Sequence, residues 1–169
     1  MILLLDIGNS RLKWAMADPL AVGARLQSAH SEPHLGEPAK LFYTLALPQV
    51  EQVWVSQVMG PQHEQKLAEA LQSHYGFAPQ FARTQAEHRG LHCGYAEPER
   101  LGVDRWLAML ALWAQTRHAF CVVNAGTALT FDAVDEGGQH QGGLIAPGLV
   151  TSEKAVLDAT RFATRPQTP

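Results

Sequence analysis

Cysteine is scarce in this chain of 169 residues, which contains two cysteines, Cys93 and Cys121. They lie far apart and follow no repeated spacing, so the sequence indicates neither a disulfide framework nor a cysteine-based zinc site. His88-x3-His92-Cys93 has a tolerable metal-ligand spacing. Without a carboxylate partner it is more typical of polar residues in a loop or at a strand edge.

Excess positive charge and long apolar runs are also lacking. Thirteen Lys and Arg against sixteen Asp and Glu give a net charge of −3, which argues against binding to nucleic acid. No apolar run reaches the ~18 residues of a membrane span. The opening MILLLDIGNS lacks the basic residues of a signal peptide, and Asp6 interrupts its apolar stretch. We therefore expect a soluble, cytoplasmic protein with no membrane partner.

What is present is an ordinary globular composition, 46% hydrophobic and 17% charged, with patterns that predict alternating strands and helices. The predicted strands are Ile2–Asp6, Arg11–Ala17, Arg25–His30, Glu51–Val58, Ala78–Ala82, Ala119–Asn124, Leu129–Val134 and Gln141–Ala146. The predicted helices are Pro38–Leu47, Gln62–Tyr75 closed by Gly76, Pro98–Arg117 and Leu149–Ala163. We expect Trp54, Trp106 and Trp113 in the core.

A strand–turn–strand unit occurs twice in the chain. The first copy carries D-x-G-N-S beginning at Asp6, and the second carries N-x-G-T-A beginning at Asn124. Two such units separated by a strand and helix segment indicate duplicated α/β halves. We place the first domain at residues 1–117 and the second at 118–169.

Both turns combine glycine with small polar side chains, and such backbone can cradle phosphate groups. In the first turn Lys13 could pair with phosphate charge and Asp6 could orient hydrated Mg²⁺, but an ordinary hairpin with Asp6 and Asn9 as turn formers explains it equally well. In the second turn Thr127 would supply a hydroxyl donor. That turn alone is more typical of a plain glycine hairpin, and only its pairing with the first favours phosphate binding.

The pair Asp104-Arg105 lies between Gly102 and Trp106, near the predicted start of the long helix. Asp104 could be a general base for a substrate hydroxyl, and Arg105 could grip a carboxylate or phosphate. In the alternative, Asp104 interacts with the helix dipole or caps the helix N-terminus, and Arg105 is a solvated surface charge. The glycines of 142–148 could admit a nucleotide, although tight packing is the more typical reason for them.

Taken together, these segments resemble one family. The motifs are D-I-G-N-S-R-L-K-W from Asp6, G-Y-x-x-P-x-x-L-G-x-D-R-W from Gly94, N-A-G-T-A-L-T-x-D from Asn124 and G-G-x-I-x-P-G from Gly142. In this order and spacing they are similar to the type III pantothenate kinases, a family that includes Bvg accessory factor proteins.

The resemblance implies an acetate/sugar kinase–Hsp70–actin-like fold with two RNase H-like halves and mixed sheets. It implies transfer of the ATP γ-phosphoryl group to pantothenate, the first step of coenzyme A synthesis, in a homodimer. Asp104 would be the catalytic base, and Arg105 would bind the pantothenate carboxylate. The pantothenate site would comprise Tyr95, Gly102, Val103, Asp104 and Arg105. The ATP site would comprise Asp6, Ile7, Gly8, Asn9, Ser10, Arg11, Leu12, Lys13 and Thr127, with Mg²⁺ held by Asp6 through water.

Two features depart from the family pattern. Where the second motif usually begins with an Asp that helps to bind K⁺ or NH₄⁺, this chain has Asn124, whose amide supplies a carbonyl oxygen but no charge. The chain also stops at Pro169, so we expect the second half to be cut short. These departures keep open a non-catalytic regulatory protein with the same fold. A kinase of another small hydroxylated substrate stays open as well.

Overall fold

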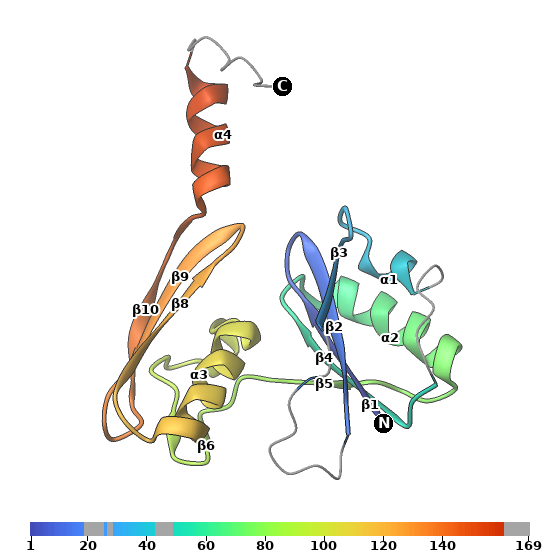
Figure 1. Ribbon diagram of the computed structural model, residues 1–169, viewed down its shortest axis with the longest axis horizontal. Helices are drawn as coiled ribbons and strands as arrows, with labels where there is room; N and C mark the ends of the chain where they lie inside the picture. The colour runs from blue at the N-terminus through green and yellow to red at the C-terminus, as the bar shows by residue number, and fades with distance from the viewer. Residues whose placement is uncertain (19–25, 27–28, 43–48, 161–169) are drawn as a thin grey trace. The chain divides into compact units, whose positions relative to one another are not determined.

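The computed structural model of the chain describes residues 1–18, 26, 29–42 and 49–160. It divides into two compact units (Figure 1), Met1–Ala86 with Tyr95–Ala108 and Glu87–Gly94 with Met109–Pro169. Residues 87–94 and 109–117 therefore group with the second unit, whereas the boundary expected from the sequence puts them in the first domain.

The first unit is built on a five-stranded mixed sheet in the order β3-β2-β1-β4-β5. Its strands are β1 (Ile2–Ile7), β2 (Arg11–Ala17), β3 (Ala29–Pro33), β4 (Gln52–Gln57) and β5 (Gln80–Phe81). The first three strands form an antiparallel meander, and β4 and β5 continue the sheet parallel to β1. This order and these directions are those of an RNase H-like domain.

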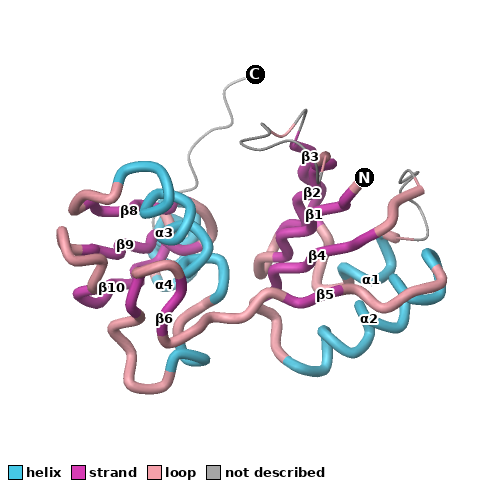
Figure 2. The backbone as a smooth tube through the Cα atoms, turned by 90° about the horizontal axis from the view of Figure 1, so that it is seen from below, coloured by secondary structure: helices cyan, strands magenta, loops and turns pink. Residues whose placement is uncertain are grey.

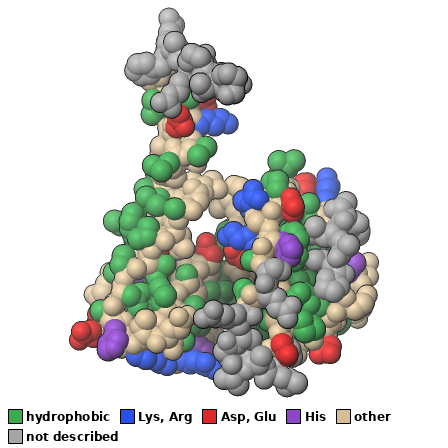
Figure 3. All heavy atoms as spheres, in the orientation of Figure 1, with side chains coloured by type: hydrophobic (Ala, Val, Ile, Leu, Met, Phe, Trp, Pro, Cys, Tyr) green, Lys and Arg blue, Asp and Glu red, His purple; other side chains and the backbone are tan. Residues whose placement is uncertain are grey.

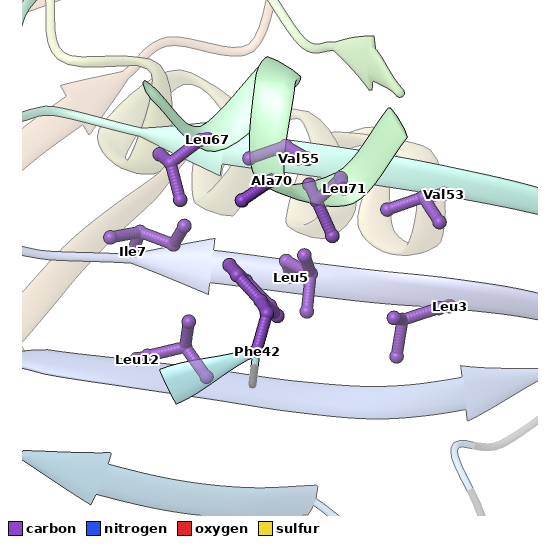
Figure 4. Packing of buried hydrophobic residues seen from close by; sticks show 10 residues of the cluster. All are labelled: Leu3, Leu5, Ile7, Leu12, Phe42, Val53, Val55, Leu67, Ala70 and Leu71. Carbon is purple, nitrogen blue, oxygen red and sulfur yellow. The ribbon is translucent and has the colours of Figure 1, made fainter. Parts of the chain in front are cut away.

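Two helices cover one face of this sheet: α1 (Pro38–Leu41) and α2 (Pro61–Tyr75), seen together on one side of β4 and β5 in Figure 2. Alternation along β1 turns Leu3, Leu5 and Ile7 toward these helices, where all three are buried. Figure 4 shows the resulting core, which consists of Leu3, Leu5, Ile7, Leu12, Phe42, Val53, Val55, Leu67, Ala70 and Leu71. Leu5 and Ile7 thus anchor the end of β1 in the core. Asp6, which lies between them, points to the sheet face that the helices do not cover.

Several boundaries differ from the predicted ones in this unit. The third strand begins at Ala29 and extends to Pro33, and Arg25 at its predicted start lies outside the described residues. The first helix ends at Leu41 in the described part, and residues 43–47 of its predicted range are not described. Gly76 closes α2 in the left-handed conformation as predicted.

Trp54 was expected in the core and is instead 39% exposed. The alternation of β4 places Val53 and Val55 on the buried face, so the residue between them must face the other way. Trp106 and Trp113, the other tryptophans expected in the core, are buried as predicted.

The long predicted helix at Pro98–Arg117 is two elements. A 3-10 turn, η1 (Pro98–Arg100), is followed by Leu101 in an extended conformation and then by α3 (Val103–Thr116). Extended backbone at Leu101 prevents a continuous helix. Asp104 is consequently in the first turn of α3, six residues after the start of the predicted helix.

The second unit contains a three-stranded antiparallel sheet in the order β10-β9-β8. Its strands are β8 (Phe120–Ala125), β9 (Ala128–Val134) and β10 (His140–Pro147), followed by α4 (Leu149–Ala159). A short hairpin joins β6 (Glu87–His88) to β7 (Leu91–His92). The order β8, β9, β10, helix repeats the order β1, β2, β3, helix of the first unit.

The two copies differ in what covers them. Val123 is 53% exposed, whereas Leu5, at the same place in β1, is 3% exposed beneath the helices. Figure 3 shows hydrophobic side chains on the surface of the sheet β8–β10 and of α4. Leu144 of β10 and Leu149 of α4 are among the exposed hydrophobic residues. No helix in the described segments has the length and apolar character that crossing a membrane requires.

Candidate functional site

The first turn presents an exposed pair of opposite charges. Asp6 faces Lys13 across the β1–β2 ladder and Ser56 across the parallel β1–β4 ladder. Its Oδ2 lies 3.0 Å from Lys13 Nζ, and its Oδ1 accepts a hydrogen bond from Ser56 Oγ at 3.2 Å. Ion pairs this exposed contribute little to stability, so the pair can exchange partners with a ligand at small cost.

Within the turn, the Gly8 N–H donates to the Arg11 carbonyl at 3.0 Å, and Asn9 and Ser10 are exposed. The Arg11 guanidinium bonds to Ser31 of β3, to Oγ at 2.7 Å and to the carbonyl at 2.9 Å. Ile7 and Leu12 were predicted site residues as well, and both are fully buried in the core. Lys13 is therefore the cation of this segment that sits beside Asp6.

The second turn also begins with a glycine whose N–H is bonded within the turn, but it is one residue shorter and carries no charged pair. The Gly126 N–H donates to the Ala128 carbonyl at 3.0 Å, and Asn124 pairs with Thr130, its Nδ2 lying 3.4 Å from Oγ1. Thr127 is exposed, and its carbonyl accepts hydrogen bonds from the Gly148 N–H at 3.0 Å and Thr151 Oγ1 at 2.8 Å. The start of α4 thus holds this turn in place.

Gly102 leaves space that the Asp104 carboxylate occupies. A Cβ at Gly102 would lie 2.6 Å from Asp104 Oδ1. That oxygen accepts the Arg105 backbone N–H at 2.8 Å, and the Asp104 side chain is exposed at the start of α3. Glycine therefore leaves the room in which the Asp104 carboxylate lies.

Arg105 is not the solvated surface charge of the alternative interpretation, because it is only 5% exposed. The neighbouring Val103 is also buried, and Tyr95 is half-buried. Because less water screens a buried guanidinium, its Coulombic attraction to a carboxylate is stronger than at the surface.

The predicted residues form two sets. Asp6–Lys13, Tyr95 and 102–105 belong to the first unit, and Asn124 and Thr127 belong to the second. Among the residues that the structure describes, no three His, Cys, Asp or Glu side chains cluster as a metal cage. Asp6, an exposed carboxylate beside a glycine turn, is the kind of ligand that suits Mg²⁺, which usually takes one or two carboxylates together with substrate phosphates.

Two residues of this region were missed by the sequence reasoning. Ser56 contacts Asp6 and is 7% exposed, and His34 is 3% exposed and contacts Gly8. The strand pattern of Glu51–Val58 placed Ser56 in a strand, but only its register against β1 brings it to Asp6. His34 carried no sequence signal, since nothing local links it to a turn 26 residues earlier.

The type III pantothenate kinase family model matches residues 2–165. This chain belongs to the type III pantothenate kinase family. A type III pantothenate kinase from Nitrosococcus oceani is 38% identical over 169 aligned residues, covering 95% of this chain and 62% of that protein. The chain spans about 62% of the length of the curated relatives that it matches.

Solved structures of low sequence identity share the fold. A Campylobacter jejuni protein described as a Baf family transcriptional activator gives a TM-score of 0.58 at 21% identity, covering 99% of this chain and 65% of that one. A Sinorhizobium meliloti protein described as a 2-dehydro-3-deoxygalactonokinase gives 0.51 at 12% identity, covering 97% and 58%. The predicted actin-like kinase fold is confirmed by these neighbours and by the repeated strand order.

Proposed function

We propose that this chain transfers the γ-phosphoryl group of ATP to the primary hydroxyl of pantothenate, giving 4′-phosphopantothenate in the first step of coenzyme A synthesis. The observation that carries the proposal is the exposed Asp6–Lys13 pair at a glycine turn, in a chain that belongs to the type III pantothenate kinase family. Phosphoryl transfer depends mainly on positioning and charge neutralisation, and this pair offers both.

The first turn would hold the ATP phosphates. Lys13 lies close enough to Asp6 to exchange that carboxylate for a phosphate oxygen with a small movement of its flexible stem. Asp6 would then be released to hold Mg²⁺ through water, with Ser56 keeping its other oxygen in place. Bound Mg²⁺ supplies charge neutralisation on the phosphates. Thr127 would contribute a hydroxyl from the second turn.

The segment from Tyr95 to Arg105 would hold pantothenate. Asp104, exposed and given room by Gly102, would accept the proton of the attacking hydroxyl. We assign Arg105 to the pantothenate carboxylate, because its burial would strengthen that ion pair. Tyr95 and Val103 would line the same site.

The proposal includes a homodimer in the cytoplasm and a site for K⁺ or NH₄⁺ at Asn124. The amide oxygen of Asn124 can coordinate a monovalent cation, but without a formal charge it would do so weakly.

Pantothenate-dependent formation of ADP by the purified 169-residue protein, with Mg²⁺ and ATP, tests the activity. We expect turnover by the wild type and a loss of about 10²–10⁴-fold in kcat for Asp104→Asn. ATP binding should survive in that variant, because the amide keeps the shape and the acceptor oxygen at the start of α3.

The matched control is Asp158→Asn, which removes an exposed carboxylate from α4 and should leave turnover unchanged. A folded wild-type protein that forms no ADP with pantothenate would overturn the proposed activity. Full activity in Asp104→Asn would overturn the assignment of the base while leaving the activity standing.

A further inference from the structure

The carbonyl groups of the first turn are held by one buried residue. His34 follows β3 directly, and its Nε2 lies 2.8 Å from the Gly8 carbonyl oxygen. Its backbone N–H donates to the Ser10 carbonyl at 3.2 Å. His34 therefore binds the first and the last residue of the turn that holds Gly8, Asn9 and Ser10.

The partners of the imidazole assign its tautomer. The Gly36 N–H donates to His34 Nδ1 at 3.1 Å, so Nδ1 carries a lone pair. The ring proton must then be on Nε2, which donates it to the Gly8 carbonyl. A neutral imidazole of this one tautomer satisfies both contacts, and the ring acts as a rigid spacer between two backbone segments.

The backbone next to His34 contains one strained residue, Leu35. The Glu37 N–H donates to the His34 carbonyl at 2.8 Å, closing a tight turn through Leu35 and Gly36. Leu35 has φ +49, a conformation that is unfavourable for a non-glycine residue, and its side chain is 92% exposed. No packing of Leu35 compensates that cost, so the contacts of the turn must do so.

In the second unit, the residue equivalent to His34 is a glycine, so no side chain binds the turn there. Pro33 pairs with Arg11 at the start of β2, and Pro147 pairs with Ala128 at the start of β9, so His34 and Gly148 are equivalent. The Gly148 N–H donates to Thr127 as the His34 N–H donates to Ser10. A Cβ at Gly148, however, would lie 2.1 Å from the Gly126 carbonyl oxygen.

The difference follows from the lengths of the two turns. The second turn holds Gly126 and Thr127, one residue fewer than the first. It lies so close to Gly148, the residue after β10, that no side chain fits at that position. In the first unit an imidazole lies between the chain and Gly8. A phosphate-binding turn works when its N–H groups, rather than its carbonyls, face the anion.

We propose that His34 is the positioning residue of the phosphate-binding turn: by holding the carbonyls of Gly8 and Ser10, it keeps the turn in the conformation that binds the ATP phosphates. The inference rests on the proposed function, because it assigns His34 a role in nucleotide affinity. His34 touches the turn and acts through it.

The test compares two substitutions of similar size. His34→Gln places an amide N–H near the position of Nε2 and can still reach the Gly8 carbonyl. His34→Asn keeps an acceptor near the position of Nδ1 but is too short to reach Gly8. The readout is the Kd for Mg·AMP-PNP, measured by titration calorimetry on the 169-residue protein. Thermal unfolding of both variants shows whether the fold is retained.

We expect His34→Asn to weaken Mg·AMP-PNP binding by roughly 10-fold, since a neutral hydrogen bond that positions the turn is lost. His34→Gln should stay within about 3-fold of the wild type. His63→Gln is the matched control, because His63 Nδ1 also contacts a backbone carbonyl, that of Met59, at 3.1 Å and away from the turn. It should bind as the wild type does.

Equal affinities for His34→Asn, His34→Gln and the wild type would overturn the inference. A wild type that binds no Mg·AMP-PNP would overturn the proposed function instead. Amide hydrogen exchange at Gly8, whose N–H donates to Arg11, separates the two cases without nucleotide. Exchange that is faster in His34→Asn supports a turn held by His34, and unchanged exchange contradicts it.

Discussion

Asp6 and Asn124 are topologically equivalent, each the penultimate residue of the strand that leads into a glycine turn. Asp6 faces Lys13 across its ladder, and Asn124 faces Thr130. The same backbone unit is therefore charged in one copy and neutral in the other, with a 3.0 Å ion pair replaced by a contact of 3.4 Å between an amide and a hydroxyl. Because of this difference, the first turn offers a formal charge of each sign to a ligand, and the second offers only dipoles.

Asn124→Asp should create a dependence on monovalent cations. A carboxylate at this position would bind K⁺ through a formal charge, whereas the amide offers only a dipole. We expect wild-type turnover to fall only slightly when K⁺ is replaced by a bulky quaternary ammonium ion, because the Asn124 amide binds K⁺ weakly. In the variant, K⁺ should raise the rate by roughly 10-fold, the effect of one charge-assisted contact.

The measurement is initial rate against K⁺ concentration at constant ionic strength. Asp158→Asn, far from the turn in sequence and exposed, controls for changes in net charge. A wild type that already requires K⁺ would contradict the argument, because the amide oxygen would then suffice.

Lys13→Met should weaken nucleotide binding without destabilising the fold. The Lys13–Asp6 pair is exposed and contributes no more than about 1 kcal/mol to the free energy of unfolding. A phosphate contact from the same ammonium is charge-assisted, so we expect the Kd for Mg·AMP-PNP to rise about 10- to 100-fold. Calorimetry and urea denaturation give the two quantities.

Lys40→Met is the matched comparison, since Lys40 lies 4.0 Å from Glu37 in another exposed pair of the same unit. Both variants should unfold at similar urea concentrations, and only Lys13→Met should lose affinity. Equal Kd values in the two variants would remove Lys13 from the nucleotide site.

In Tyr75→Phe, the free energy of unfolding should fall less at alkaline pH than it does in the wild type. Burial raises the pKa of Tyr75 above its ordinary value of 10.0. The unfolded chain then loses this proton at a lower pH than the folded one, so the free energy of unfolding falls as pH rises from about 10 toward the folded pKa. Phenylalanine has no proton to lose there.

Urea denaturation at about pH 8 and again above about pH 10 measures this effect. Wild type and Tyr75→Phe should respond differently to the change in pH, with the smaller loss of stability in the variant. An equal loss in both would show that other groups account for the alkaline sensitivity.

Local signals were enough for the parts of the fold that depend on local chemistry. The apolar run before Asp6, its echo before Asn124, and the glycines that follow predicted both hairpins to within a residue. The apolar pattern predicted the helix that carries Asp104, but it placed the start at Pro98, whereas α3 begins at Val103. Both hairpin turns are therefore specified by residues that are neighbours along the chain.

What the sequence did not predict depends on contacts between distant segments. Trp54 sits in an apolar stretch but faces outward, because the buried side of β4 is set by its neighbours on β1 and α2. The burial of Arg105 and the contact of His34 with Gly8 likewise depend on how separate elements pack. The alternation along β4 shows that Trp54 and the two valines beside it face opposite sides of the strand, but only contacts with other elements determine which side is buried.

Gly138→Ala should destabilise the second unit far more than Gly137→Ala. A Cβ at Gly138 would lie 2.2 Å from the Gly90 carbonyl oxygen and 2.7 Å from Trp113 Cζ2, and its φ of +80 is unfavourable for alanine. Left-handed backbone and overpacking together cost about 2–5 kcal/mol. At Gly137 the nearest atom to a Cβ would be Asp135 Oδ1 at 3.3 Å, so the loss should stay within about 1 kcal/mol. Urea denaturation of both variants, followed by tryptophan fluorescence, gives the difference. Equal midpoints would mean that the β6–β7 hairpin does not pack on Trp113 as the structure has it.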